Sequence, residues 1–338
     1  MRPIALGSNL LHRFYRGGSS IAAFRGIACD DEYAPEDWVG STTTAFGSDE
    51  AGLSSLPDGR LLREAIEAGP EAFVGPDHAA LPGPEPGILV KLLDAGERLP
   101  VHLHPDRTFA ARAFGSAVGK TEAWLIVGAR GEPVVHVGFR EEVDRETLKG
   151  WVKRQDAEAL LAAMNPIPVA AGDTVYVPAG VPHAIGEGIF MVEVQEPSDL
   201  SILLEWNGFA INGDVEYHLG LGLERALGAV DRSAWAGDRL ARLREGRGRV
   251  RPGVEALLPQ EADAFFRAER IRPDPEAELE PAFSILVGVA GAGELETAGG
   301  ERMPLCRGDT LLVPYAAGPC RVTGEVEALR CLPPEVVT

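Results

Sequence analysis

Two seven-residue segments of this 338-residue chain are nearly the same, and they constrain its fold more than any other feature. Residues 172–178 read Gly-Asp-Thr-Val-Tyr-Val-Pro, and residues 308–314 read Gly-Asp-Thr-Leu-Leu-Val-Pro. In each segment a turn-forming Gly-Asp pair leads into a short apolar run that ends at proline, which is typical of a β-strand between turns. A repeat of one such unit predicts two related β units in the chain.

The rest of the hydrophobic pattern predicts a mainly β protein with inserted and linking α-helices. Short apolar runs predict further strands at 88–93, 123–127, 133–137, 189–195 and 283–289. Helical periodicity is found at 61–68, 145–164 and 218–245.

These patterns divide the chain into three parts. We expect an N-terminal metal-binding domain over residues 1–206, with a helical insert at about 145–165, and a helical linker segment over 207–250. The third part, 251–338, is expected to be a C-terminal domain without metal ligands. Its repeated segment is followed by Pro319 and Cys320, whereas the first repeated segment is followed by His183.

Three of the seven histidines occupy positions that suit a metal site. His102 and His104 are two residues apart, so an extended strand places both imidazoles on one face, with Val101 and Leu103 on the other. His183 follows a predicted strand. Imidazoles and a carboxylate presented from strands suit a borderline transition metal that keeps open coordination positions. We therefore predict that these three histidines bind a metal ion.

Composition argues against several classes of partner. The chain has 32 Lys and Arg against 51 Asp and Glu, and its net charge of −19 disfavours nucleic acid and anionic membranes as partners. It shows neither an apolar leader nor a run of 18 apolar residues, so we expect a cytoplasmic protein without a membrane span. The four cysteines lack paired metal spacing and are expected to be reduced thiols. Nothing in the sequence indicates the oligomeric state.

The histidine motifs resemble those of the cupin barrel. The first cupin motif is a glycine, five residues and His-x-His, and it is matched by Gly96, His102 and His104. The second is a glycine, five residues, Pro-x-Gly, two residues and histidine, matched by Gly172, Pro178, Gly180 and His183. In most cupins a glutamate follows the second histidine within a few residues, but here the matching residue is Glu122, in Gly-Lys-Thr-Glu.

The displaced glutamate and the order of the motifs resemble type I phosphomannose isomerase, a family of the cupin superfamily. The matching segments are Leu89–Asp94, His102–Asp106, Gly119–Trp124 and Pro178–His183. The resemblance implies double-stranded β-helix (cupin) barrels in two related units. It also implies one Zn²⁺ per chain, held by His102, His104, Glu122 and His183, and a sugar phosphate as the small-molecule partner.

The same resemblance implies a sugar site at Lys120 and Glu193. Glu193 is the first candidate for the base that removes the proton, and Lys120 is a candidate for handling oxygen protons. Three phosphate-side groups of the family have no match in this chain. There is no arginine at 202–204, Pro100 stands in place of a serine, and no lysine lies near Asn207.

The implied reaction is the interconversion of mannose 6-phosphate and fructose 6-phosphate through a cis-enediol(ate). Three alternatives remain open: an isomerase of a different, unphosphorylated sugar, an Fe(II) cupin oxygenase, and a non-catalytic metal-cupin sugar-binding protein. The missing arginine favours the first and the third. The glutamate spacing argues against the oxygenase, and the intact ligand set argues against a non-catalytic protein.

Overall fold

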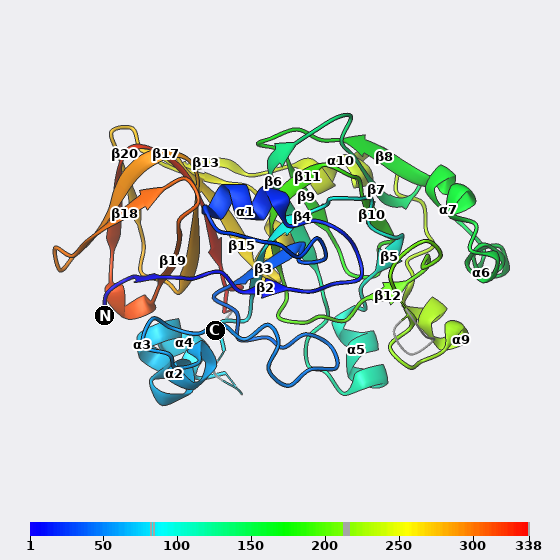
Figure 1. Cartoon of the computed structure of the whole chain (residues 1–338), viewed down its shortest axis with the longest axis horizontal. Helices are drawn as coiled ribbons and strands as arrows, with labels where there is room; N and C mark the ends of the chain where they lie inside the picture. The colour runs from blue at the N-terminus through cyan, green and yellow to red at the C-terminus, as the bar shows by residue number, and fades with distance from the viewer. Residues whose placement is uncertain (82, 84, 212–216, 337–338) are drawn as a thin grey trace.

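The computed structural model describes residues 1–81, 83, 85–211 and 217–336. Its described part is mainly β, as predicted, with three sheets of nine, five and six strands whose paired strands all run antiparallel. In Figure 1 the nine-stranded sheet lies at the left, mostly yellow to red, and the other two sheets lie at the centre and right.

The six-stranded sheet contains most of the strands that were predicted in the first half of the chain. Its order is β2 (Leu10–Leu11), β3 (Glu36–Val39), β4 (Leu89–Asp94), β11 (Ile189–Gln195), β6 (Glu122–Ala129) and β9 (Thr174–Val177). Every residue of β3, β4 and β11 is buried, which explains why β4 and β11 read as nearly continuous apolar runs. The few charged residues in these strands are therefore enclosed within the protein.

The five-stranded sheet faces the six-stranded sheet across a cavity that residues of both sheets line. Its order is β12 (Ile202–Leu203), β5 (His102–Leu103), β10 (His183–Ile185), β7 (Val134–Phe139) and β8 (Met164–Pro168). In this sheet His102 pairs directly with His183 on one side and with Leu203 on the other.

The nine-stranded sheet forms the C-terminal part of the molecule. It contains β1 (Ile4–Ala5), β13 (Gly248–Arg251), β14 (Val254–Ala256), β15 (Arg267–Ile271), β16 (Glu276–Leu279), β17 (Ser284–Thr297), β18 (Arg302–Cys306), β19 (Thr310–Val313) and β20 (Cys320–Leu332). The first repeated segment forms β9 and the second forms β19, each beginning at its threonine. Strand β1 pairs with β19, so the first residues of the chain belong to the sheet of the last strands.

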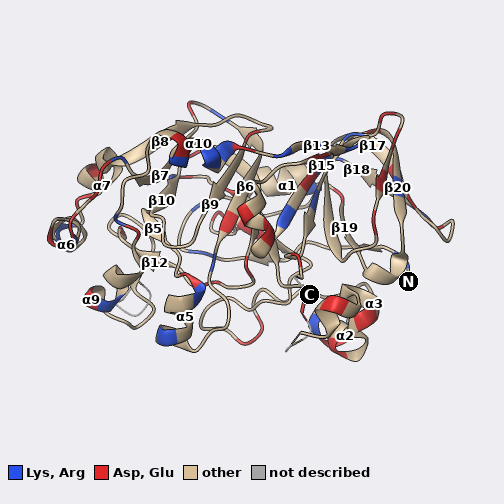
Figure 2. Cartoon of the chain, turned by 180° about the vertical axis from the view of Figure 1, so that it is seen from behind, with Lys and Arg blue, Asp and Glu red and all other residues tan. Residues whose placement is uncertain are grey.

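The helices cover the outside of this β structure. They are α1 (Ser19–Arg25), α2 (Leu62–Ala68), α3 (Pro70–Val74), α4 (Pro76–Ala79), α5 (Arg107–Phe114), α6 (Arg145–Arg154), α7 (Ala157–Ala163), α9 (Leu223–Ala226) and α10 (Gly237–Ala241). Short 3₁₀ helices are η1 (Leu227–Ala229), η2 (Arg242–Arg244), η3 (Gln260–Ala264) and η4 (Tyr315–Ala317). Figure 2 shows α2 and α3, with their acidic residues coloured red, below the nine-stranded sheet and beside both termini.

Local sequence explains the predicted helices. Asp144 and Asp156 cap α6 and α7, because their carboxylates accept hydrogen bonds from the backbone N–H groups of Thr147 and Ala159. In the predicted linker over 207–250 the helices of the described residues are short, the last of them ends at Arg244, and strand β13 begins at Gly248. Residues 212–216 lie outside the described part of the chain.

One hydrophobic core joins the N-terminal and C-terminal strands. It includes Trp124 and Val192 of the six-stranded sheet together with Ile285 and Leu312 of the nine-stranded sheet, all at most 1% exposed. The predicted domain boundaries stay a prediction, but the two β units share this core. Among the described residues no helix is both long and apolar enough to cross a membrane.

Candidate metal centre and active site

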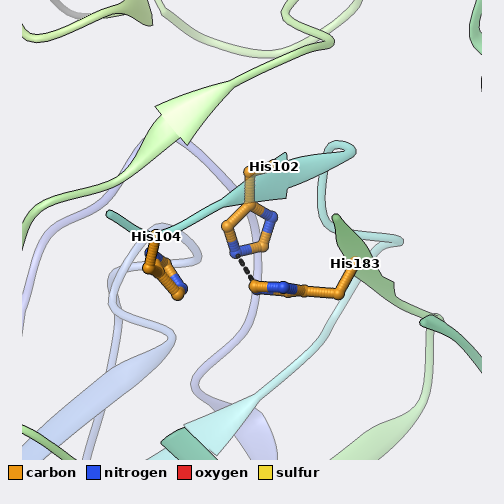
Figure 3. A group of neighbouring side chains, drawn as sticks. All are labelled: His102, His104 and His183. Carbon is orange, nitrogen blue, oxygen red and sulfur yellow. Dashed lines mark hydrogen bonds between the residues drawn. The ribbon is translucent and has the colours of Figure 1, made fainter. Parts of the chain in front are cut away.

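Three buried histidines converge between the two facing sheets. His102 on β5 and His183 on β10 are paired across neighbouring strands, and His104 follows directly after β5. In Figure 3 the three rings point toward a common space. One ring nitrogen of each histidine lies within 4.8 Å of the others, so the three could hold a metal ion.

Backbone carbonyls orient all three imidazoles in the same way. The Nδ1 atoms lie at 2.8 Å from Pro100 O for His102, at 3.0 Å from Leu200 O for His104 and at 2.8 Å from Val181 O for His183. A carbonyl oxygen can only accept a hydrogen bond, so we assign the ring proton to Nδ1 in each case. Each neutral ring therefore presents the lone pair of Nε2 to the common space, which is the state in which histidine binds a metal.

The approach of two Nε2 atoms indicates that a cation belongs between them. The Nε2 atoms of His102 and His183 are 3.0 Å apart, and with both protons on Nδ1 no hydrogen lies between these nitrogens. Burial lowers the pKa of His102 well below its usual value, with the other two rings adding to the effect, and burial also lowers the pKa of His183. Burial and the nearby ammonium of Lys120 lower the pKa of His104 to about 3. The rings are thus neutral near neutral pH.

Glu122 adds a carboxylate to this cluster. Its Oε2 lies 2.9 Å from His104 Nε2, and its Oε1 lies 3.4 Å from His183 Nε2 and accepts a 2.9 Å hydrogen bond from Trp124 Nε1. Burial opposes ionisation, but His104 and Lys120 hold the pKa of Glu122 well below its usual range. Oε2 is buried and accepts no hydrogen bond. A donor set of three imidazole nitrogens and one carboxylate oxygen fits Zn²⁺ or a similar divalent metal.

The two residues predicted for the sugar site lie beside this cluster. Lys120 is 4% exposed, and its Nζ lies 2.9 Å from His104 Nε2 and 3.3 Å from Glu122 Oε2. Glu193 on β11 is 2% exposed, and burial together with the charge of Glu122 raises its pKa to about 7. His102, Lys120 and Glu193 all line one cavity, so the structure brings the predicted residues together. Their roles remain predictions.

The cavity itself is narrow. Its volume is ≈ 40 Å³, well below the roughly 300–1,000 Å³ of typical small-molecule sites. Its polar lining residues are Arg13, Tyr15, Glu36, Lys91, His102, Lys120, Glu193 and Ser201. A hexose can enter only if side chains that line the cavity move, and Phe14 and Leu99 are among its apolar lining residues.

The sequence analysis missed a buried network of charges that forms one side of the cavity. Lys91 Nζ lies 3.2 Å from Glu193 Oε1 and 3.5 Å from Glu36 Oε2. Glu36 also accepts hydrogen bonds from the hydroxyl of Tyr15 and, at 2.6 Å, from Trp38 Nε1. A lysine within the apolar run 88–93 was the signal that could have revealed this network, because a charge inside a fully buried strand needs a partner.

Sheet register creates this network. Trp38 on β3, Lys91 on β4, Glu193 on β11 and Trp124 on β6 are successive partners across the sheet, so their side chains form one row. Because side chains alternate along a strand, Glu122 points to the same face as Trp124, two residues away. The row therefore connects the three histidines and Glu122 to the buried charges.

Known proteins of similar sequence are mannose-6-phosphate isomerases. The mannose-6-phosphate isomerase of Streptococcus mutans is 32% identical over 202 residues, which are 58% of this chain and 58% of that protein. A second relative, the Bacillus subtilis mannose-6-phosphate isomerase ManA, is 26% identical over 322 residues, 93% of each chain. This chain thus spans little more than half of the first relative and nearly all of the second. No family model matches the chain.

Solved structures of mannose 6-phosphate isomerases share the fold. The crystal structure of the Bacillus subtilis enzyme matches with a TM-score of 0.80 at 22% identity and covers 98% of this chain and 99% of that one. A mannose 6-phosphate isomerase bound with zinc and yttrium matches with a TM-score of 0.74 at 15% identity, covering 99% and 100% of the two chains. The resemblance expected from the motifs is confirmed: this chain is a sequence relative of the mannose-6-phosphate isomerases and has their fold.

Proposed function

We propose that the protein is a zinc-dependent aldose–ketose isomerase that interconverts mannose-type and fructose-type hexoses. The predicted pair is mannose 6-phosphate and fructose 6-phosphate, and the relatives are named for the first of these sugars. The observation that carries the proposal is the convergence of three Nε2 lone pairs and Glu122 Oε2 beside a buried carboxyl group, Glu193, whose pKa is raised to about 7.

The ligands of the metal would be His102, His104, Glu122 and His183. A divalent cation bound there supplies Lewis-acid stabilisation of the negative charge that develops on the sugar oxygens during isomerisation. The Nδ1 atom of each of the three histidines donates a hydrogen bond to a backbone carbonyl, which fixes both the tautomer and the orientation of the ring.

Glu193 is suited to move the proton between the two carbon atoms. A base is most effective when its pKa lies near the working pH, and burial raises the pKa of Glu193 to about 7. Its carboxylate lies in the wall of the cavity that His102 and Lys120 also line, so it could accept a proton from C2 of the aldose and return it to C1 of the ketose. The ammonium of Lys91, 3.2 Å away, holds this carboxylate in position and favours its ionised form.

Lys120 is suited to serve the oxygen atoms of the sugar. In the structure its Nζ donates to His104 Nε2, the lone pair that a metal would take. With that lone pair engaged by a metal, the ammonium is free to donate to a sugar oxygen and to stabilise the enediolate. The carbon and oxygen protons would thus be handled by different groups, Glu193 and Lys120.

A metal-exchange experiment tests the proposal. The purified protein is stripped with a chelator and reloaded separately with Zn²⁺ and Fe²⁺, and ketose formation from mannose 6-phosphate and from mannose is measured. We expect isomerisation with Zn²⁺ and its loss on chelation. Dioxygen consumption with Fe²⁺ and no isomerisation would instead identify the oxygenase alternative. Zinc and sugar binding without turnover would identify the sugar-binding alternative.

A further inference from the structure

We propose that the nine-stranded sheet supports the candidate site by holding the Gly119–Glu122 segment in place, with Glu196 and Arg107 as positioning residues. The segment carries Lys120 and Glu122, so this inference rests on the proposed isomerase function and adds two residues to it. It also gives a role in the site to the part of the chain that carries no predicted metal ligand.

The Gly119–Glu122 segment depends on tertiary contacts for its position. Its first three residues lie outside any strand, and β6 begins at Glu122. The backbone N–H of Lys120 donates to the carbonyl of Pro105 at 3.0 Å. A side chain at Gly119 would clash, because a Cβ there would lie 2.7 Å from Pro105 O. The segment therefore packs directly on the backbone that follows strand β5.

Glu196 fixes the middle of this segment. Its Oε2 accepts a hydrogen bond from the backbone N–H of Thr121 at 2.8 Å, and its own backbone N–H donates to Thr121 O at 3.0 Å. Both residues are at most 2% exposed, so these hydrogen bonds are shielded from water. Thr121 lies between Lys120 and Glu122 in the chain, so a displacement of its backbone would move both side chains.

Arg107 supplies the counter-charge for the buried carboxylate of Glu196. Its Nε donates to Glu196 Oε1 at 2.6 Å, while its own side chain is 46% exposed. A carboxylate that is removed from water is costly unless it is paired. An unpaired Glu196 would turn toward water, which would break its hydrogen bond to Thr121.

The nine-stranded sheet holds Arg107 from the other side. Nη2 of Arg107 donates to Ala264 O at 3.0 Å, and its Cζ lies 4.6 Å from the centroid of the Phe265 ring, which is a cation–π contact. Ala264 ends η3, and Phe265 follows it, between strands β14 and β15 of that sheet. One chain of contacts thus runs from the nine-stranded sheet through Arg107 and Glu196 to Thr121.

A bound metal would leave this chain of contacts intact. The donor atoms proposed for the metal are ring nitrogens of three histidines and an oxygen of Glu122, which are not among the atoms that Arg107 and Glu196 contact. Arg107 and Glu196 also lie outside the lining of the cavity, so they act on the site through the position of Lys120 and Glu122.

Two substitutions of Glu196 test the hydrogen bond to Thr121. In Glu196→Ala it is lost, so we expect the Kd for Zn²⁺, measured by competition with a coloured chelator, to rise about 10- to 100-fold. At saturating zinc, kcat for mannose 6-phosphate should fall by a similar factor while KM changes little, because no contact to the sugar is removed. Glu196→Gln keeps an oxygen that can accept from Thr121 and should restore most of both losses. A folded Glu196→Ala variant with the zinc affinity of the wild type would overturn the inference, as would a Glu196→Gln variant equally impaired.

Two further variants test the link to the nine-stranded sheet. Arg107→Met removes the counter-charge and should raise the Kd for Zn²⁺ as Glu196→Ala does, and Phe265→Leu removes the cation–π contact and should raise it about two- to fivefold. If either variant folded and bound zinc as the wild type does, the part assigned to the nine-stranded sheet would be refuted.

Arg239→Met is the matched control for Arg107→Met. Arg239 is 44% exposed, its Cζ lies 3.6 Å from the centroid of the Trp235 ring, and it donates to Asp231 Oδ2 at 2.8 Å and to Ala234 O at 2.9 Å. Asp231 makes its other side-chain hydrogen bonds within its own loop, so the zinc affinity should equal that of the wild type. An equal loss in both variants would overturn the inference.

Zinc affinity separates a failure of this inference from a failure of the proposed function, because the competition measurement needs no turnover. Absence of turnover in the zinc-loaded wild type would overturn the isomerase proposal, and the zinc affinities would still decide whether Glu196 and Arg107 position Glu122. Unchanged zinc affinities in the folded variants would overturn this inference and leave the isomerase proposal standing.

Discussion

His102 and His183 face each other across β5 and β10, and their Nε2 atoms lie 3.0 Å apart while both Nδ1 atoms are held by backbone carbonyls. Two acceptor nitrogens at this distance repel each other unless a cation lies between them. The strand pairing thus creates a site that could hold a metal ion, and binding of such an ion should stabilise the fold.

Replacing His104 should remove the metal. The variant His104→Ala loses one of three nitrogen ligands, so we expect zinc content to fall to a small fraction of one per chain and turnover to fall at least 100-fold. Atomic absorption and a ketose assay on the same sample measure both. His12→Ala is the control, because the side chain of His12 is 71% exposed and pairs with Asp31 at the surface. Full turnover without bound metal would refute the mechanism.

Replacing Lys120 should separate metal binding from catalysis. In Lys120→Ala the four ligands remain, so zinc content should be unchanged, whereas kcat should fall by roughly 10²-fold because the group that serves the sugar oxygens is lost. Steady-state kinetics with a parallel zinc determination give both quantities. Unchanged kcat would return Lys120 to the role of a buried lysine that only balances the charge of Glu122.

The activity should increase with pH as Glu193 ionises. Only the carboxylate can accept a proton, so kcat/KM should rise through an apparent pKa at or below about 7, the lower values reflecting the charge of a bound cation. A pH–rate profile of the zinc-loaded protein measures this rise, which forms the ascending limb of the profile. Glu193→Gln keeps the size of the side chain and should abolish both the limb and most of the activity. A profile that keeps the same limb in that variant would show that another group is the base.

The same carboxyl group should affect stability in the metal-free protein. Burial raises its pKa from 4.5 to about 7, so the folded state binds this proton more tightly than the unfolded state does. This contribution is fully present below about pH 4.5 and is lost as the pH rises through about 7, by an amount on the order of 3 kcal/mol. Urea denaturation of wild type and Glu193→Gln at pH 5 and pH 8 should show a smaller pH dependence in the variant.

Short-range patterns were enough to predict much of the fold. The apolar runs at 88–93 and 189–195 became β4 and β11, and the periodicity at 145–164 became α6 and α7. The pairing of β1 with β19 was not foreseeable, because it joins residues about 300 positions apart and β1 has only two residues. Long-range pairing leaves little trace in the pattern of so short a strand.

The candidate site, like the fold, could be predicted from the sequence only in part. The spacing of His102, His104 and His183, and the Gly-Lys-Thr-Glu segment, identified side chains that the structure brings together. The partners of Glu193 could not be found in this way, because they depend on the register of β3, β4 and β11. That register places Lys91 beside Glu193 and Trp38 beside Lys91.

Lys91 should therefore act as a positioning residue for Glu193. Its ammonium is 2% exposed, and its removal in Lys91→Met leaves Glu36 and Glu193 without their shared counter-ion. We expect the pKa of Glu193 to rise, so that the ascending limb of the pH–rate profile moves to higher pH, and we expect stability to fall by roughly 3–5 kcal/mol. Lys91→Arg keeps the charge and should restore the limb toward its original position. If Lys91→Met lowered stability but left the limb in place, Lys91 would be structural only, since a change in packing does not by itself move the ionisation of Glu193.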